Sequence, residues 1–106
     1  MRTIEVQSWK SKAKSGDEVD EDTLMMLTHL LNNRAPERMP RGLDQFRLYN
    51  RLTKAFDRAK ESKTLVLEEM DYKFLKDIVV QDVPASWGAN EHIMAAIENF
   101  MQTKED

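Results

Sequence analysis

The chain lacks several residue types on which common chemistries depend. It has no cysteine among its 106 residues, which excludes disulfides, thiolate metal sites and a cysteine nucleophile. His29 and His92 have no second histidine or carboxylate at the spacing of a two-ligand helical metal site. Gly16, Gly42 and Gly88 are too scattered for a phosphate loop, and no serine sits in a nucleophile motif. We therefore expect no cofactor, no metal and no catalysis; abundant carboxylates are the only argument for an enzyme.

Long apolar runs are also absent. No stretch approaches the roughly 18 residues that a membrane span needs, and no apolar signal core follows Met1. The hydrophobic fraction of 41% and the charged fraction of 33% are typical of a folded, globular chain rather than a disordered one. The length fits one small domain, residues 1–106. The sequence thus predicts a cytoplasmic, single-domain protein without membrane contact.

Apolar residues recur at helical spacing in four segments. Three predicted helices span residues 20 to 32, 41 to 60 and 70 to 81, and a fourth follows Asn90, its expected cap, with Ile93, Ile97, Phe100 and Met101 on one face. Asp20 is the expected N-cap of the first helix, and Met70 is expected on the buried arc of the third. The polar stretch before the first helix, residues 10 to 22, is expected to be an exposed loop.

Two short segments alternate between apolar and polar residues. Ile4 and Val6 alternate near the N-terminus, and Leu65 and Leu67 alternate between the second and third predicted helices. We expect strands at residues 3 to 7 and 64 to 68 that pair as a ribbon, preferably within one chain, although pairing between chains stays open. The predicted fold is mainly α, a small four-helix domain with a short two-stranded β-ribbon.

Charge is segregated along the chain. Residues 34 to 60 hold eight cations against three carboxylates, so this segment is +5, and the net charge of -3 leaves -8 for the remainder. Arg47, Arg51, Lys54 and Arg58 follow one another by four, three and four residues and form one stripe on the second helix. Such a stripe can hold phosphates or a row of carboxylates. The alternative, a solvated face opposite the core, is the commoner use of such residues.

The stretch RAPERMPRG, residues 34 to 42, connects the first two predicted helices. Pro36 and Pro40 restrict their own backbone and that of the preceding residue, so we expect a stiff connection. Its arginines, Arg34, Arg38 and Arg41, would then continue the basic stripe beyond the start of the helix.

Two apolar side chains are candidates for contact with a partner. Trp87 lies in PASWGAN, a predicted turn, where it either covers the edge of the core or anchors an interface. Met25 lies away from the leucine face of its helix and is expected to be exposed.

The segment TLVLEEMDYKFLKDIVVQDVPASW joins a strand, a helix with an acidic start and a proline turn with tryptophan. It covers about a quarter of the chain and resembles stretches in small accessory proteins encoded by tailed phages and prophages. The resemblance implies a role in assembly or regulation through protein contacts in the host cytoplasm. No functional residue is carried over from it.

These features together predict a non-catalytic protein–protein interaction or assembly module that docks a protein partner or self-associates. The alternative is a small nucleic-acid-binding regulator that uses the basic stripe. No small-molecule substrate is expected. The predicted partner-binding residues are Arg38, Arg41, Arg47, Arg51, Lys54, Arg58 and Trp87.

Overall fold

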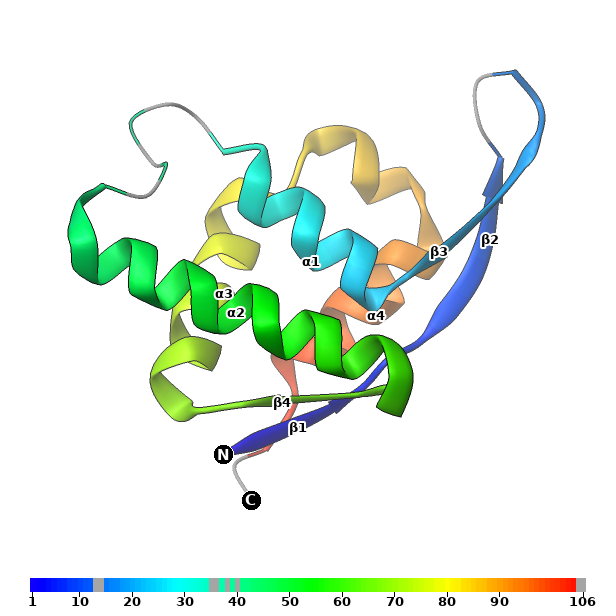
Figure 1. Ribbon diagram of the computed structural model, residues 1–106. Helices are drawn as coiled ribbons and strands as arrows, with labels where there is room; N and C mark the ends of the chain where they lie inside the picture. The colour runs from blue at the N-terminus through cyan, green and yellow to red at the C-terminus, as the bar shows by residue number, and fades with distance from the viewer. Residues whose placement is uncertain (13–14, 35–36, 38, 40, 105–106) are drawn as a thin grey trace.

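The computed structural model describes residues 1–12, 15–34, 37, 39 and 41–104. This part of the chain forms four α-helices, a short 3-10 helix and two antiparallel two-stranded sheets (Figure 1). The elements are β1 (Arg2–Glu5), β2 (Ser8–Lys12), β3 (Glu18–Asp22), α1 (Thr23–Asn32), α2 (Gly42–Ser62), β4 (Thr64–Leu67), α3 (Glu69–Asp82), η2 (Ala85–Ala89) and α4 (Glu91–Met101). The expectation of a mainly helical fold with four helices is confirmed.

The predicted ribbon between the N-terminal strand and the strand after α2 is present. β1 and β4 pair antiparallel within the chain, with Ile4 opposite Leu65. Ile4, Leu65 and Leu67 turn to the core and are buried. Lys63 makes this pairing possible because its left-handed backbone, with φ of 60°, ends α2 and reverses the chain, so that β4 returns along α2 (Figure 1).

The predicted loop at residues 10 to 22 is wrong, because most of it lies in a second hairpin formed by β2 and β3. Lys10 lies opposite Asp20, and Lys12 lies opposite Glu18. Opposite charges on facing strands stabilise such a pair without any apolar alternation. Trp9 of β2 packs against the core, and the hydroxyl of Ser11 accepts a hydrogen bond of 3.1 Å from the side chain of Asn90, while the far ends of β2 and β3 lie away from the helices in Figure 1. No side chain of either strand is fully buried, which explains why the sequence carries little signal of burial here.

The hairpin also moves the start of the first helix. Asp20 lies inside β3, so the prediction that it caps the helix is wrong. Asp22 is the N-cap instead, and its carboxylate accepts a hydrogen bond of 2.8 Å from the backbone N–H of Met25.

The core lies between α1, α3, α4, the C-terminal half of α2 and the inner face of the β1–β4 ribbon. On α3 the buried arc contains Tyr72, Leu75, Ile78 and Val79. Met70 was expected on this arc, but its side chain is 76% exposed. Because α3 begins at Glu69, its first turn turns Asp71 and Tyr72 inward and leaves Met70 in solvent.

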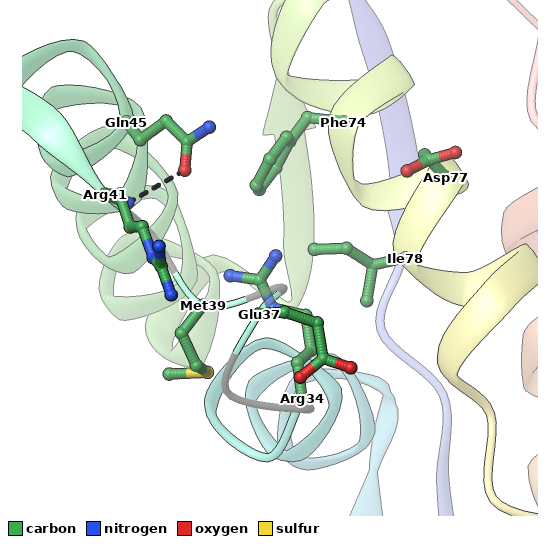
Figure 2. Close-up of a pocket in the computed structure, with 8 residues that line it drawn as sticks. All are labelled: Arg34, Glu37, Met39, Arg41, Gln45, Phe74, Asp77 and Ile78. Atoms are coloured by element: carbon green, nitrogen blue, oxygen red, sulfur yellow. Dashed lines mark hydrogen bonds between the residues drawn. The ribbon is translucent and has the colours of Figure 1, made fainter.

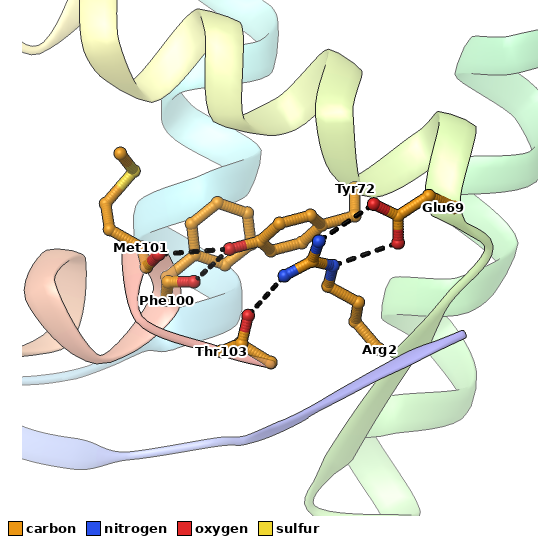
Figure 3. A network of polar contacts seen from close by, with 6 residues as sticks. All are labelled: Arg2, Glu69, Tyr72, Phe100, Met101 and Thr103. Atoms are coloured by element: carbon orange, nitrogen blue, oxygen red, sulfur yellow. Dashed lines mark hydrogen bonds and ion pairs between the residues drawn. The ribbon is translucent and has the colours of Figure 1, made fainter. Parts of the chain in front are cut away.

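A polar network joins the two ends of the described chain to α3 (Figure 3). Arg2 holds Glu69 through two hydrogen bonds of 2.9 and 2.8 Å, and it also donates to the carbonyl of Thr103. Its guanidinium lies over the ring of Tyr72, 4.2 Å from the centroid. The hydrogen bond from Arg2 lowers the pKa of Glu69, and burial raises the pKa of Tyr72. The network fastens β1 onto the helices.

Among the helices in the described part of the chain, none combines the length and apolar character that crossing a membrane requires.

Candidate functional site

A groove of about 550 Å³ runs between α2 and the outer face of β4. One helical face of α2 and the outward residues of β4 form its walls, and the first residue of the chain and the start of α3 complete it. The lining residues are Met1, Arg51, Ala55, Arg58, Ser62, Thr64, Val66, Glu68 and Asp71. We refer to this feature as the α2–β4 groove.

The sequence builds both walls by simple periodicity. Arg51, Ala55 and Arg58 are four and three residues apart, so they share one face of α2, where the basic stripe meets the buried arc. On β4, Leu65 points inward, and Val66 therefore points outward, where its side chain is 47% exposed. The groove thus has apolar surface from Ala55 and Val66 directly beside two arginines.

In the part of the chain that the structure describes, β4 pairs with β1 alone, so its other edge is open to a further strand. The N–H of Val6 donates to the carbonyl of Lys63 over 3.0 Å, and in an antiparallel pair such bonds recur at every second residue. Leu65 therefore bonds toward β1, and the N–H and C=O of Val66 point toward the open edge. At Thr64 the backbone N–H donates to the hydroxyl of Ser62 over 3.3 Å, and that hydroxyl donates to the backbone C=O over 3.0 Å. Val66 is left as the backbone group that an added strand could pair with.

Arg51 is fixed in the groove by a buried carboxylate. Its Nη2 and Nε lie 3.0 and 3.4 Å from the two carboxylate oxygens of Asp71, which is only 5% exposed. The hydrogen bond that Arg51 donates to Asp71 and the negative charge of that carboxylate raise the pKa of Arg51. The guanidinium of Arg51 is itself about half exposed, so it can still face a ligand. Asp71 thus orients Arg51 rather than merely compensating the helix end.

Arg58 is in a different state. Within the described residues its guanidinium makes one hydrogen bond, a 3.4 Å contact from Nε to the carbonyl of Lys54 in its own helix, and no ion pair. Its charge is therefore available for an anionic partner in the groove.

The four predicted stripe residues are all exposed on α2, as the sequence indicated. Arg51 and Arg58 line the groove, and Lys54 lies between them on the outer side of the helix. Arg47 lies beyond the groove and makes a 3.6 Å ion pair with Asp44 on the surface. The stripe is thus divided, with its C-terminal half beside the groove.

The arginines of the connection lie elsewhere. Arg41 precedes α2, and its backbone N–H donates to Gln45, while Arg34 lies over the ring of Phe74 at 5.6 Å (Figure 2). Both line a separate hollow of about 280 Å³ between α2 and α3, so they do not extend the stripe. Arg38, Pro36 and Pro40 lie outside the described residues. The prediction that this connection is stiff therefore stays a prediction.

Trp87 lies in a third place that shares no residue with the groove. It is half-buried in η2, and its ring centroid lies 5.3 Å from that of His29. Together with Trp9 and Met25 it lines a small hollow of about 190 Å³. Met25 is 50% exposed, which confirms that expectation. Trp87 thus covers one edge of the core and remains accessible, so both interpretations of this residue stay open.

Sequence reasoning missed the β4 wall of the groove. Alternation around Leu65 and Leu67 already placed Val66 on the outer face, but nothing in the sequence places that face beside Arg51 and Arg58. Only the reversal at Lys63 does so. Within the described ranges no three histidine, aspartate or glutamate side chains gather as a metal-binding group. No protein-family model, curated protein or solved structure matches this chain.

Proposed function

We propose that this chain is a non-catalytic interaction module that captures an extended, acidic segment of a protein partner in the α2–β4 groove. The observation that carries the proposal is the placement of Arg58, whose guanidinium has no carboxylate partner within the described residues, beside apolar surface and the open edge of β4. Accessory roles in phage assembly or regulation, in the host cytoplasm, are a setting that would suit such a module.

The chemistry of the groove favours an extended peptide over a small molecule. Strand addition supplies backbone hydrogen bonds at an open edge and leaves specificity to the side chains around it. Here the backbone of Val66 would supply the pairing, and Arg51 and Arg58 would select carboxylates through paired hydrogen bonds. Val66 and Ala55 would contact an aliphatic side chain of the segment.

A nucleic-acid role is the second candidate, because all four stripe cations are exposed on one side of α2. Phosphate binding would use the whole stripe, including Arg47, and would not require the apolar surface. Glu68 and Asp71 line the same groove and repel a carboxylate as they repel a phosphate, so the exposed apolar side chain of Val66, which a phosphate backbone would leave unused, decides between the two candidates. The acidic peptide is therefore our first choice.

The test is a titration of the protein with a short synthetic peptide of alternating glutamate and valine, measured by calorimetry at low ionic strength. We expect binding that weakens at least about tenfold in the variant Lys54→Glu with Arg58→Glu, because the charges that steer and hold the carboxylates are reversed. Arg51 is left unchanged, since its loss would strand the buried carboxylate of Asp71.

The matched control is Lys60→Glu with Lys73→Glu. It changes the net charge by the same amount at two exposed positions that do not line the groove, and it should bind as the wild type does. A single-stranded oligonucleotide of equal charge serves as the competing probe. If the oligonucleotide binds and the peptide does not, the nucleic-acid candidate replaces the first one.

A further inference from the structure

The β2–β3 hairpin has the chemistry that the groove selects. Its strand β3 carries exposed carboxylates at Glu18 and Asp20, with an exposed valine, Val19, between them. Within the described residues β3 pairs only with β2, so its other edge is open. The chain therefore contains both an acidic, extended segment and a groove suited to one.

The spacings of the opposing charges agree. Glu18 and Asp20 lie two residues apart on a strand, which separates them by about 6.6 Å. Arg58 lines the groove and Lys54 lies just outside it on the outer side of α2; they are four residues apart, which separates them by about 6 Å along the helix axis. A row of two carboxylates can thus meet a row of two cations without distortion of either element.

The carboxylates of β3 are only weakly held by their own hairpin. Glu18 makes a 3.7 Å ion pair with Lys10 in which both side chains are about two-thirds exposed. Exposed pairs of this kind are worth little and exchange readily for another partner.

One molecule cannot place its own hairpin in its own groove. In Figure 1 the far ends of β2 and β3 lie at one corner of the molecule, and β4 runs along the opposite side beneath α2. A separation seen in projection is a lower limit on the separation in space. Insertion within one chain would require β2 and β3 to detach and swing across the body, so the segment that fits the groove must come from another molecule.

We propose that the occupant of the groove is the acidic hairpin of a second copy of this chain. The inference rests on the proposed function, because it names the partner of the same groove. The contact is heterologous: each copy offers a hairpin to one neighbour and a groove to another. Such contacts add copies head to tail, so the assembly grows with protein concentration and weakens with salt.

The experiment measures the mass of the protein in solution by light scattering over a range of concentrations at low ionic strength. For the wild type we expect an average mass that rises above that of the 12.4 kDa monomer. The groove variant, Lys54→Glu with Arg58→Glu, should stay monomeric. The hairpin variant, Glu18→Gln with Asp20→Asn, should stay monomeric too, because neutral amides fit the strands but do not pair with the groove.

An equimolar mixture of the two variants gives the decisive result. The groove variant still has an intact hairpin, and the hairpin variant still has an intact groove. Their mixture should therefore form a dimer of twice the monomer mass and nothing larger. Neither variant can extend the chain at its blocked end.

Two results would overturn the inference. One is a wild type that stays monomeric at every concentration, and the other is a groove variant that associates as the wild type does. If the protein stays monomeric yet binds the synthetic acidic peptide, the self-association fails and the proposed function stands. If it does neither, both fail. Should circular dichroism show that charge reversal unfolds α2, the pair Lys54→Gln with Arg58→Gln repeats the test without added negative charge.

Discussion

At the scale of single residues, Arg51 serves structure and surface together. An arginine in an exposed basic stripe is expected to be dispensable for folding, since surface charges contribute little to stability. The contact with Asp71 changes this expectation, because Asp71 is buried and its carboxylate has to be paired. The residues of the stripe are all exposed and regularly spaced, and yet they have different roles.

This difference gives a matched pair of variants. Arg51→Gln should lower the melting temperature clearly, since it leaves the carboxylate of Asp71 buried without its guanidinium. Arg58→Gln should leave the melting temperature close to that of the wild type. Differential scanning calorimetry of both proteins checks the prediction. Equal melting temperatures would mean that Asp71 finds solvent or another donor.

Tyr72 provides a second residue-scale prediction. Its buried hydroxyl donates to the carbonyl of Phe100 over 2.7 Å, and its ring packs on that of Phe100 (Figure 3). Tyr72→Phe keeps the packing and removes the donor, so it should reduce the free energy of unfolding by about 1 kcal/mol. Urea denaturation should show a lower midpoint with an unchanged slope. An unchanged midpoint would show that this bond contributes nothing net.

Glu69 makes the stability depend on pH. Its pKa in the folded protein is lowered by Arg2, so the folded state holds its proton less tightly than the unfolded state does. The stabilisation of the folded protein by Glu69 is complete above the pKa of this carboxyl in the unfolded chain, about 4.3, and is lost as the pH falls through its lower pKa in the folded protein. Glu69→Gln should therefore be less stable than the wild type at pH 7 and about equal at low pH. A stability gap that persists in acid would point to lost packing instead.

At the scale of elements, the predicted and observed structures differ where an element has no continuous apolar face. The β1–β4 ribbon and the helices could be read from the sequence, because each has a face that must leave water. The β2–β3 hairpin could not, because its strands carry no apolar alternation and the ion pair across them, from Lys10 to Glu18 over 3.7 Å, leaves no such pattern in the sequence. The sequence predicts one wall of the groove, because the spacing of the cations on α2 places them on one face. It does not predict the other wall, because the return of β4 beside those cations depends on the backbone of Lys63.

The shifted start of α1 is testable with two neighbouring aspartates. Asp22→Ala removes the side chain that accepts from the N–H of Met25 and should cost about 1 kcal/mol of stability. Asp20→Ala, in the exposed strand β3, should cost much less. Chemical denaturation of the two variants compares them directly. A larger loss of stability in Asp20→Ala than in Asp22→Ala would mean that Asp20 is the N-cap of α1, as the sequence predicted.

At the scale of the whole molecule, the fold separates a packed body from a projecting arm. Ile4, Leu65 and Leu67 of the β1–β4 ribbon are no more than 1% exposed, and the Arg2 network fastens this ribbon to α3. Neither strand of the β2–β3 hairpin has a fully buried residue, and β3 carries four carboxylates, Glu18, Asp20, Glu21 and Asp22. An element of this kind can change partners without unfolding the rest of the chain.

Amide hydrogen exchange should resolve the two parts. A two-stranded hairpin is marginal by itself, so the amides of β2 and β3 should exchange through local opening, at least about two orders of magnitude faster than those of β1 and β4. The ribbon opens only when the core does.

The comparison is made at low protein concentration, where the hairpin is not bound to a second copy. If protection of β3 then rises with concentration while that of β2 and β1 stays constant, the open edge of β3 is the surface that a second copy covers. Equal protection of both ribbons in the dilute protein would instead mean that the hairpin opens only together with the core. The hairpin would then not be free to bind a second copy.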